Sequence, residues 1–510
     1  AVGMSSNFYG IKLVASNGTG SAINGVRWDE VRVAKSWTNL FSEARAPIWK
    51  GSTGLLASQW INPFNWVGNR LPYQTNDTCV FYRTFPRTDP IQVIHLGNLY
   101  NYKGLKFNEN ASKNVNIEPV DYDIWIMKAT NGLGLFANGI EIMKESTGTH
   151  RLGNITLRAD QVWSNASDQV FTLYGYIKGG FNVEKGGVGR IHIEGGSEAH
   201  MHWSGNMTVN QGALSIGTRR SLGTNTGWTA VNPGGALELR PTGATTYFAE
   251  PLRLAGMGVT NEGALRNVQY ANVWPGAIAL YNTTRIQAEG NSTLTLTGGI
   301  NGTNAAHYLY FGGAGTIIIT NNSMGTNVID LIRDGSGTTM LARVSAHVGD
   351  TIVSNGMLML RGANMLPTQT AVRVVGSGVF NLTNNNTAIG SLAGNGQVWL
   401  GSGRLLVGAN GSNTTYNGVM SGTGGLDKLG TSTLTIAGTN SYTGATTVSN
   451  GYLVVSGSSP NSPHAVYGSG VLMGDGPIGN LTVSGEVDPG NATGTVATLE
   501  TGAIALNNGG

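Results

Sequence analysis

The feature that most constrains this chain is a short phrase that recurs six times along it. Each copy has an apolar residue, a turn centred on glycine, and then a strand in which apolar residues alternate. The copies span 209–216, 231–239, 353–360, 374–382, 448–455 and 466–473. Turn glycines of neighbouring copies are 23 residues apart (Gly212 and Gly235), 22 apart (Gly356 and Gly378) and 19 apart (Gly451 and Gly470). A strand-and-turn repeat of this period predicts stacked coils of one β unit.

Composition supports that interpretation and excludes several others. Glycine accounts for 77 of 510 residues, about twice the usual share, and supplies the positive φ that tight turns need. A hydrophobic content of 40% excludes a disordered chain. The net charge of +3 without a basic cluster argues against a nucleic-acid partner, and no apolar run is long enough for a transmembrane helix. The single cysteine, Cys79, excludes an internal disulfide and is predicted to be a small buried residue.

Strand faces follow from alternation in segments such as Ser292–Thr297 and Ser432–Ile436. No stretch of 12 residues combines helical periodicity with caps, so an all-β fold is expected. Because side chains alternate between the two faces of a strand, the leucines of these segments share one face and the threonines the other. The residues predicted to point inward are Leu214, Ile216, Leu237, Leu239, Leu294, Leu296, Leu358, Leu360, Leu434, Ile436, Leu453 and Val455.

Three regions divide the chain: a β-strand segment over 1–45, a Trp-rich cap over 46–82 and solenoid repeats over 83–510. In the first region, Gly25–Val33 resembles the closing strand of laminin-G and concanavalin-like jelly rolls. If the chain begins at Ala1, these strands lack the rest of such a sandwich and would have unpaired edges that seek a partner. We expect them to dock on the last coil of a second copy and build a head-to-tail filament. The candidate assembly residues are Phe8, Ile11, Leu13, Val26, Trp28, Val31 and Val33.

One 34-residue segment, Gly422–Val455, carries a family resemblance. Its Gly424-Gly425-Leu426, Lys428 and Tyr442-Thr443-Gly444 match the pattern of the autotransporter-associated β-strand repeat. A weaker copy covers 179–195 and 207–214, and the tail at 485–496 resembles the usual end of such arrays. The Trp-rich segment resembles the one that often precedes them, through Trp49, Gly51, Trp60, Asn65, Trp66, Pro72, Asp77 and Phe81.

The resemblance implies a right-handed parallel β-helix that is exported from a bacterium, either secreted or held at the cell surface. The family has no shared catalytic residues, so the resemblance transfers none to this chain. A tryptophan cluster at the start of a solenoid is expected to cover its first coil, with glycan contact as the alternative role.

Metal-binding candidates are weak. His192, His200 and His202 lie near Glu194 and Glu198 and could share a zinc or copper ion, but three polar side chains on a solvated strand face are the simpler interpretation. Calcium could be bound by Asp330, Asp334 and Asp350 as a structural ion, although these acids are not packed into one loop. No cofactor is expected.

The predicted function is therefore structural: a non-enzymatic extracellular protein whose copies assemble into a cell-surface fibre. The alternative is an adhesin or autotransporter-like passenger that binds glycans or other cells. A remote alternative is a polysaccharide lyase, which needs charged residues clustered on adjacent coils. With 12% charged residues and no such cluster visible in the sequence, we expect no enzyme.

Overall fold

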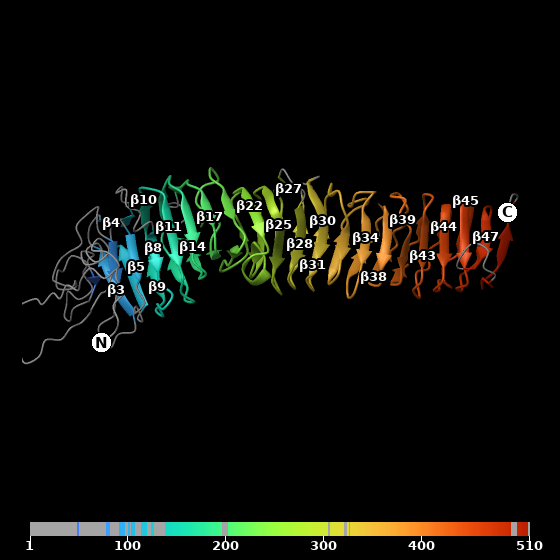
Figure 1. The fold of residues 1–510 in the computed structure, drawn as a ribbon, viewed down its shortest axis with the longest axis horizontal. Helices are drawn as coiled ribbons and strands as arrows, with labels where there is room; N and C mark the ends of the chain where they lie inside the picture. Colours follow the sequence, from blue (N-terminus) through green and yellow to red (C-terminus); the bar gives the residue numbers. More distant parts are fainter. Residues whose placement is uncertain are drawn as a thin grey trace, which may run out of the picture.

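A computed structural model describes residues 138–507, apart from 196–201, 304–306, 321–323, 326 and 491–496, together with seven strands between residues 48 and 126. The chain forms a long rod of stacked strands, with the described N-terminal strands at one end and the C-terminal strands at the other (Figure 1). The only helical element in the described residues is a short 3₁₀ turn, η4 (Val259–Asn261). None of the described residues forms a helix long and apolar enough to cross a membrane. The all-β prediction is confirmed.

Strands from successive coils pair in parallel and form three ladders along the rod. The first ladder contains β1 (Ile48–Trp49), β2 (Thr78–Phe81), β5 (Gly104–Phe107), β8 (Asn138–Ile142), β11 (Gln161–Asn165), β14 (Val183–Gly186), β17 (Met207–Val209), β19 (Thr229–Val231), β22 (Leu252–Gly256), the first half of β25 (Ile278–Ala288) and β27 (Ile300–Gly302). Its C-terminal counterpart contains β36 (Thr387–Ile389), β39 (Leu405–Val407), β42 (Leu426–Lys428), the first halves of β44 (Thr446–Val455) and β45 (His464–Gly474), β46 (Leu481–Val483) and β48 (Ile504–Leu506).

The second ladder contains β3 (Ile91–Leu96), β6 (Asn114–Pro119), β9 (His150–Leu152), β12 (Phe171–Leu173), β15 (Ile191–Ile193), β18 (Gly212–Ile216), β20 (Gly235–Leu239), β23 (Leu265–Asn267), the second half of β25, β28 (His307–Gly312), β30 (Val328–Arg333), β32 (Thr351–Val353), β34 (Ala371–Val374), β37 (Ser391–Gly394), β40 (Thr414–Tyr416), β43 (Thr433–Ile436), the second halves of β44 and β45, and β47 (Glu486–Pro489). The first and second ladders belong to one 34-stranded sheet.

The third ladder is made of two separate sheets. The five-stranded sheet contains β4 (Tyr100–Tyr102), β7 (Ile124–Ile126), β10 (Ile155–Leu157), β13 (Ile177–Gly179) and β16 (His202–Trp203). The nine-stranded sheet contains β21 (Thr245–Thr246), β24 (Ala271–Trp274), β26 (Thr293–Leu296), β29 (Thr316–Ile319), β31 (Thr338–Leu341), β33 (Met357–Leu360), β35 (Val379–Asn381), β38 (Gln397–Gly401) and β41 (Val419–Gly422).

The recurring phrase marks the corners between ladders. Leu214 pairs with Leu237 on the next coil, and Leu453 pairs with Leu472, so neighbouring copies stack in register. Copies around Gly212 and Gly451 turn from the first ladder into the second, whereas the copy around Gly356 turns from the second into the third. One phrase therefore serves two different corners of the coil, because both need the same tight change of direction before an alternating strand.

The left-handed glycine of the turn depends on the length of the copy. Gly212 has φ 66°, as expected for the shorter turn. In the three copies whose turn is one residue longer, the positive φ belongs to Gly234 (90°), Gly376 (59°) and Gly468 (59°), not to Gly235, Gly378 and Gly470 as the sequence suggested. The extra residue thus shifts the left-handed position toward the start of the turn, and the strand that follows keeps its register.

Inward side chains of all three ladders form one continuous hydrophobic core. Every one of the twelve residues predicted to point inward is buried, with an exposed fraction of 0 or 1%. Cys79 on β2 is also buried, as predicted. The period-2 pattern was sufficient here because a shift of one residue would expose the whole set.

Some inward positions at strand ends carry a cation that satisfies the carbonyl groups of the adjoining corner. The Lys428 ammonium group donates to the carbonyl oxygens of Leu429, Gly430 and Asn450 at 2.7, 2.8 and 3.2 Å. Lys185 donates in the same way to three carbonyl oxygens on its own and the next corner. Burial lowers the pKa of Lys185 to about 7 and that of Lys428 to about 8. The lysine of the family repeat therefore has a structural role, since corner carbonyls buried without a donor would be destabilising.

The predicted N-terminal regions are described only in part. All seven candidate assembly residues, from Phe8 to Val33, lie outside the described residues, as do Trp60 and Trp66. Trp49 lies on β1, which pairs with β2, and β2 pairs with β5. The first ladder therefore runs through the two described strands of the Trp-rich segment.

Candidate functional site

A single column of polar side chains follows the outside of the second ladder. In register on successive strands are Arg151, Thr172, His192, Ser215, Glu238, Arg266 and Gln287. They occupy the positions between the inward-facing apolar residues, so alternation turns them outward. Parallel pairing places each one beside its equivalent on the next coil, and charges far apart in the sequence become neighbours.

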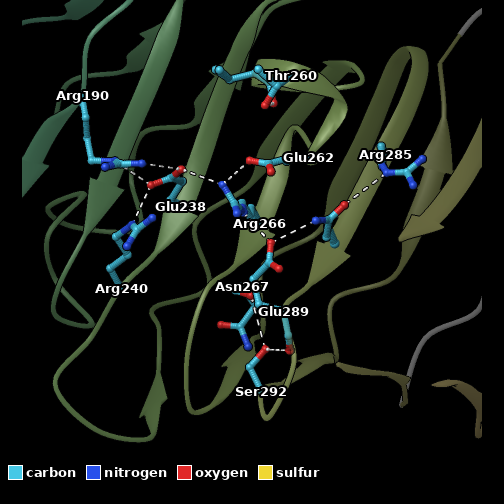
Figure 2. Close-up of polar contacts among 12 residues, drawn as sticks. Arg190, Glu238, Arg240, Thr260, Glu262, Arg266, Asn267, Arg285, Glu289 and Ser292 are labelled. Atoms are coloured by element: carbon cyan, nitrogen blue, oxygen red, sulfur yellow. Dashed lines mark hydrogen bonds and ion pairs between the residues drawn. The ribbon is translucent and has the colours of Figure 1, made fainter. Parts of the chain in front are cut away.

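Glu238 is the centre of this column. Arg190 contacts both of its carboxylate oxygens, with Nε to Oε2 at 2.8 Å and Nη2 to Oε1 at 3.2 Å. Arg240 donates to Oε2 at 2.7 Å, and Arg266 approaches Oε1 at 3.4 Å. Figure 2 shows the three guanidinium groups arranged around this one carboxylate.

The environment of Glu238 favours its charged form. Its side chain is only 3% exposed, and burial alone would raise the pKa of the carboxyl group. Hydrogen bonds and positive charge from Arg190 and Arg240 outweigh that effect and hold the pKa below its ordinary value of 4.5. Glu238 is therefore a buried anion that depends on its arginines.

The network continues along the rod through Arg266 and Arg285. Arg266 contacts Glu262 at 2.6 Å through Nη1 and Glu289 at 2.6 Å through Nε. The side chain of Gln287 bridges Glu289 and Arg285 at 2.9 and 3.2 Å. Arg285 then forms a two-pronged pair with Asp334, in which both distances are 2.8 Å. We call this set, from Arg190 to Asp334, the arginine–carboxylate network.

A strained loop supplies one of its carboxylates. Between β22 and β23, Thr260 and Asn261 adopt positive φ values of 50° and 61°. A β-branched residue such as Thr260 is rare in this region of the backbone, and such strain often marks functional segments. Both side chains are exposed, and the loop places Glu262 against Arg266 (Figure 2).

Two of the three histidine candidates are described, and they lie on different sheets. His192 is on β15 of the large sheet, and His202 is exposed on β16 of the five-stranded sheet. His200 lies outside the described residues. His192 hydrogen-bonds through Nδ1 to the Ser215 hydroxyl at 2.9 Å, and burial lowers the pKa of His192. Ser215 is fully buried, so a substrate cannot reach its hydroxyl group without a rearrangement.

The calcium candidates come together only in part. Asp334 is paired with Arg285, while a carboxylate oxygen of Asp330 accepts the backbone N–H of Asp350 at 2.8 Å. Burial and the charge of Asp330 raise the pKa of Asp350. In the described part of the chain, no group of three or more His, Cys, Asp or Glu side chains is placed to hold a metal ion.

The arginine–carboxylate network was not predicted. In the sequence its charges are scattered, but the structure gathers them on the coils of one ladder. Its three glutamates and Asp334 already accept from arginine, which leaves them poorly suited to bind calcium. The sequence did contain one signal of this network. Glu238 and Arg266 occupy the outward positions of Leu237–Leu239 and Leu265–Asn267, two strands that belong to neighbouring coils.

Comparison with known proteins agrees with this architecture. Residues 426–455 match the passenger-associated-transport-repeat family. The chain is 31% identical over 354 residues, 68% of its length, to the adhesin BmaC autotransporter of Brucella suis. It is 39% identical over 87 residues, 17% of its length, to an extracellular serine protease of Serratia marcescens.

These matches cover 9% of the length of the adhesin and 8% of that of the protease. No solved structure matches the chain. The predicted family resemblance is supported at 426–455, inside the segment from which it was drawn. The jelly-roll resemblance of residues 25–33 lies outside the described residues. The chain is thus a parallel β-solenoid that carries a passenger-associated transport repeat and is similar over 354 residues to an autotransporter adhesin.

Proposed function

We propose that this chain is part of a bacterial surface or secreted adhesin, a rod that acts by binding rather than by chemistry. The observation that carries the proposal is the similarity to an autotransporter adhesin over 354 residues, 68% of the chain. Both matched relatives are bacterial, one an autotransporter and the other extracellular by name, which supports a location outside the cell.

The continuous core supports the same role. A solenoid whose inward faces form one hydrophobic cluster is a stiff scaffold, and its outward positions are available for recognition. From the sequence alone, a self-assembling fibre was the predicted function and an adhesin was the alternative. The similarity supports the adhesin, whereas the filament stays a prediction whose proposed assembly strands lie outside the described residues.

Adhesion can be tested with the full chain. Beads coated with it should attach to cultured epithelial cells or to bacterial cells in at least several-fold greater number than beads coated with the heat-unfolded chain. Attachment that is equal for the folded and unfolded chains on both cell types would contradict the proposal.

The absence of catalysis also stays a prediction, because a stretch of 87 residues resembles an extracellular serine protease. A fluorophosphonate probe, which labels activated serines, should not react with the folded chain. Labelling that disappears in Ser215→Ala would overturn the prediction and would show that the Ser215–His192 pair becomes accessible.

A further inference from the structure

The outer face of the nine-stranded sheet is a second candidate surface. Its strands show regular alternation: on β26, β29, β31 and β33 every second residue is buried and the others face outward. The inward residues, such as Leu294 and Leu358, belong to the core. The outward residues of each strand are therefore a separate surface, and parallel pairing aligns them into rows along the rod.

Two rows of outward residues run from β24 to β41, and neither contains a charged residue. The first row is Ala271, Thr293, Thr316, Thr338, Met357, Val379, Gln397 and Val419. The second row is Val273, Thr295, Ile318, Met340, Met359, Asn381, Trp399 and Ser421. We call these sixteen residues the neutral face. A cation lies at its edge, where Arg361 approaches the Met340 sulfur at 3.9 Å.

The chemistry of the neutral face changes along its length. Threonine hydroxyls dominate on β26, β29 and β31, and methionine, valine and tryptophan follow on β33 to β41. Trp399 is 39% exposed, and its indole N–H donates to the Gln397 side chain at 3.0 Å, which fixes the orientation of the ring. The surface thus offers both hydroxyl groups and a flat aromatic plane, with no charge to be compensated.

We infer that the neutral face binds an uncharged polysaccharide that lies along the rod. The absence of charge favours a partner without charge, since electrostatic complementarity governs which partners a surface accepts. Sugar rings carry hydroxyls around their rim and C–H groups on their faces, and these match threonine rows and an exposed indole. A linear polymer also suits rows that repeat at the strand spacing of about 4.8 Å.

A protein partner fits the neutral face less well. Protein interfaces concentrate their binding energy in central clusters of tryptophan, tyrosine and arginine. Here the two rows hold one aromatic residue, on one of the last strands, and no arginine. Each contact with a sugar would be weak, but a polymer that spans several coils gains avidity of about 10²–10⁴ over a single unit. This inference rests on the proposed adhesin function and names its ligand class.

The test uses the full chain and calorimetric titration with three neutral polysaccharides (hydroxyethyl cellulose, dextran and soluble starch) and one anionic polysaccharide, alginate. We expect binding to at least one neutral polymer. The affinity should change less than about twofold between low and high salt, because no ion pairs form. A tetrasaccharide of the same sugar should bind about 100-fold more weakly.

Variants locate the site. The double variant Ile318→Asp/Met359→Asp places two carboxylates in the second row and should weaken binding at least about tenfold. The control Thr208→Asp/Thr482→Asp adds the same charges to outward positions of the first ladder, and its affinity should stay within about twofold of the original chain. Trp399→Ala is an independent test that adds no charge and should weaken binding several-fold.

Several outcomes would overturn the inference. The chain could fail to bind any of the three neutral polymers, or it could bind alginate more tightly in a way that depends on salt. The double variant and its control could also lose affinity for the polysaccharide equally. Sedimentation that shows rods pairing through this face, and separating in the double variant, would make a second copy the occupant instead. If coated beads adhere to cells and the double variant adheres equally well, this inference fails while the proposed function stands. If the original chain does not adhere at all, the proposed function fails.

Discussion

Two neighbouring ladders of the same coils have opposite outer surfaces. The second ladder carries the arginine–carboxylate network from Arg190 to Asp334, and from β24 onward the third ladder carries the neutral face. Their inner faces are alike, since Leu237 and Leu358 are both fully buried in one core. The solenoid therefore constrains only every second residue of a strand, and the outward residues are available for different tasks.

The two surfaces also differ in how much their outward side chains contribute to the stability of the fold. In the second ladder, Glu238 is buried and depends on three arginines, so its loss would remove the carboxylate that Arg190 and Arg240 contact, whereas Arg266 would keep Glu262 and Glu289. In the third ladder the sixteen residues of the neutral face carry no charge, so none of them is part of an ion pair. We expect the charged ladder to be sensitive to substitution and acid, and the neutral face to tolerate change.

The largest expected effect is common to both ladders. Leu237→Ala and Leu358→Ala each leave a cavity in the core and should lower the free energy of unfolding by about 2–5 kcal/mol. Because solenoid stability is largely local, hydrogen exchange in β20 and β33 should report each loss separately. A loss in only one of the two variants would contradict the common core.

The second effect distinguishes the ladders. Glu238→Gln removes the negative charge at the centre of the three arginines and should cost about 2–3 kcal/mol, measured by denaturant unfolding. The matched control is Glu194→Gln, whose pair with Arg151 is exposed on both sides, and it should cost less than about 1 kcal/mol. Equal costs would mean that burial of Glu238 contributes nothing.

The third effect concerns acid. The pKa of Glu238 is lower in the folded chain than its ordinary value of 4.5, so its charge stabilises the fold at neutral pH. That contribution is complete above pH 4.5 and is lost as the pH falls through the folded pKa. The difference in melting temperature between the original chain and Glu238→Gln should therefore shrink when the pH is lowered from 7 to about 3. A difference that is constant with pH would show that the stabilisation does not involve the charge of Glu238.

The smallest effect is expected on the neutral face. Thr338→Val replaces an outward hydroxyl in the first row and should change the free energy of unfolding by no more than about 0.5 kcal/mol. Thermal unfolding can measure this change. A large loss would show that the threonine row supports the fold and is not free to serve recognition.

Much of the fold was predictable because it depends on local patterns. Alternation identified residues such as Leu294 and Leu434 as inward-facing, and the glycine phrase located the corners. The exact glycine with positive φ was harder, because one extra residue in a turn moved it from the expected Gly235 to Gly234. The candidate site was not predictable in this way. Arg190 and Glu238 are 48 residues apart, and nothing in either segment indicates the other.

By itself, the sequence determined that this chain is an all-β solenoid with a continuous apolar interior. The spacing of apolar residues and glycines is a local pattern, which involves residues only a few positions apart. Only the tertiary structure decided which outward residues meet. Strand pairing between neighbouring coils joins residues as little as 15 apart, at Val471 and Glu486, and as much as 35 apart, at Leu105 and Ile140. Because the coil length varies, the register between strands depends on how each turn folds. That register brings the charges of one ladder together and leaves the neighbouring face neutral.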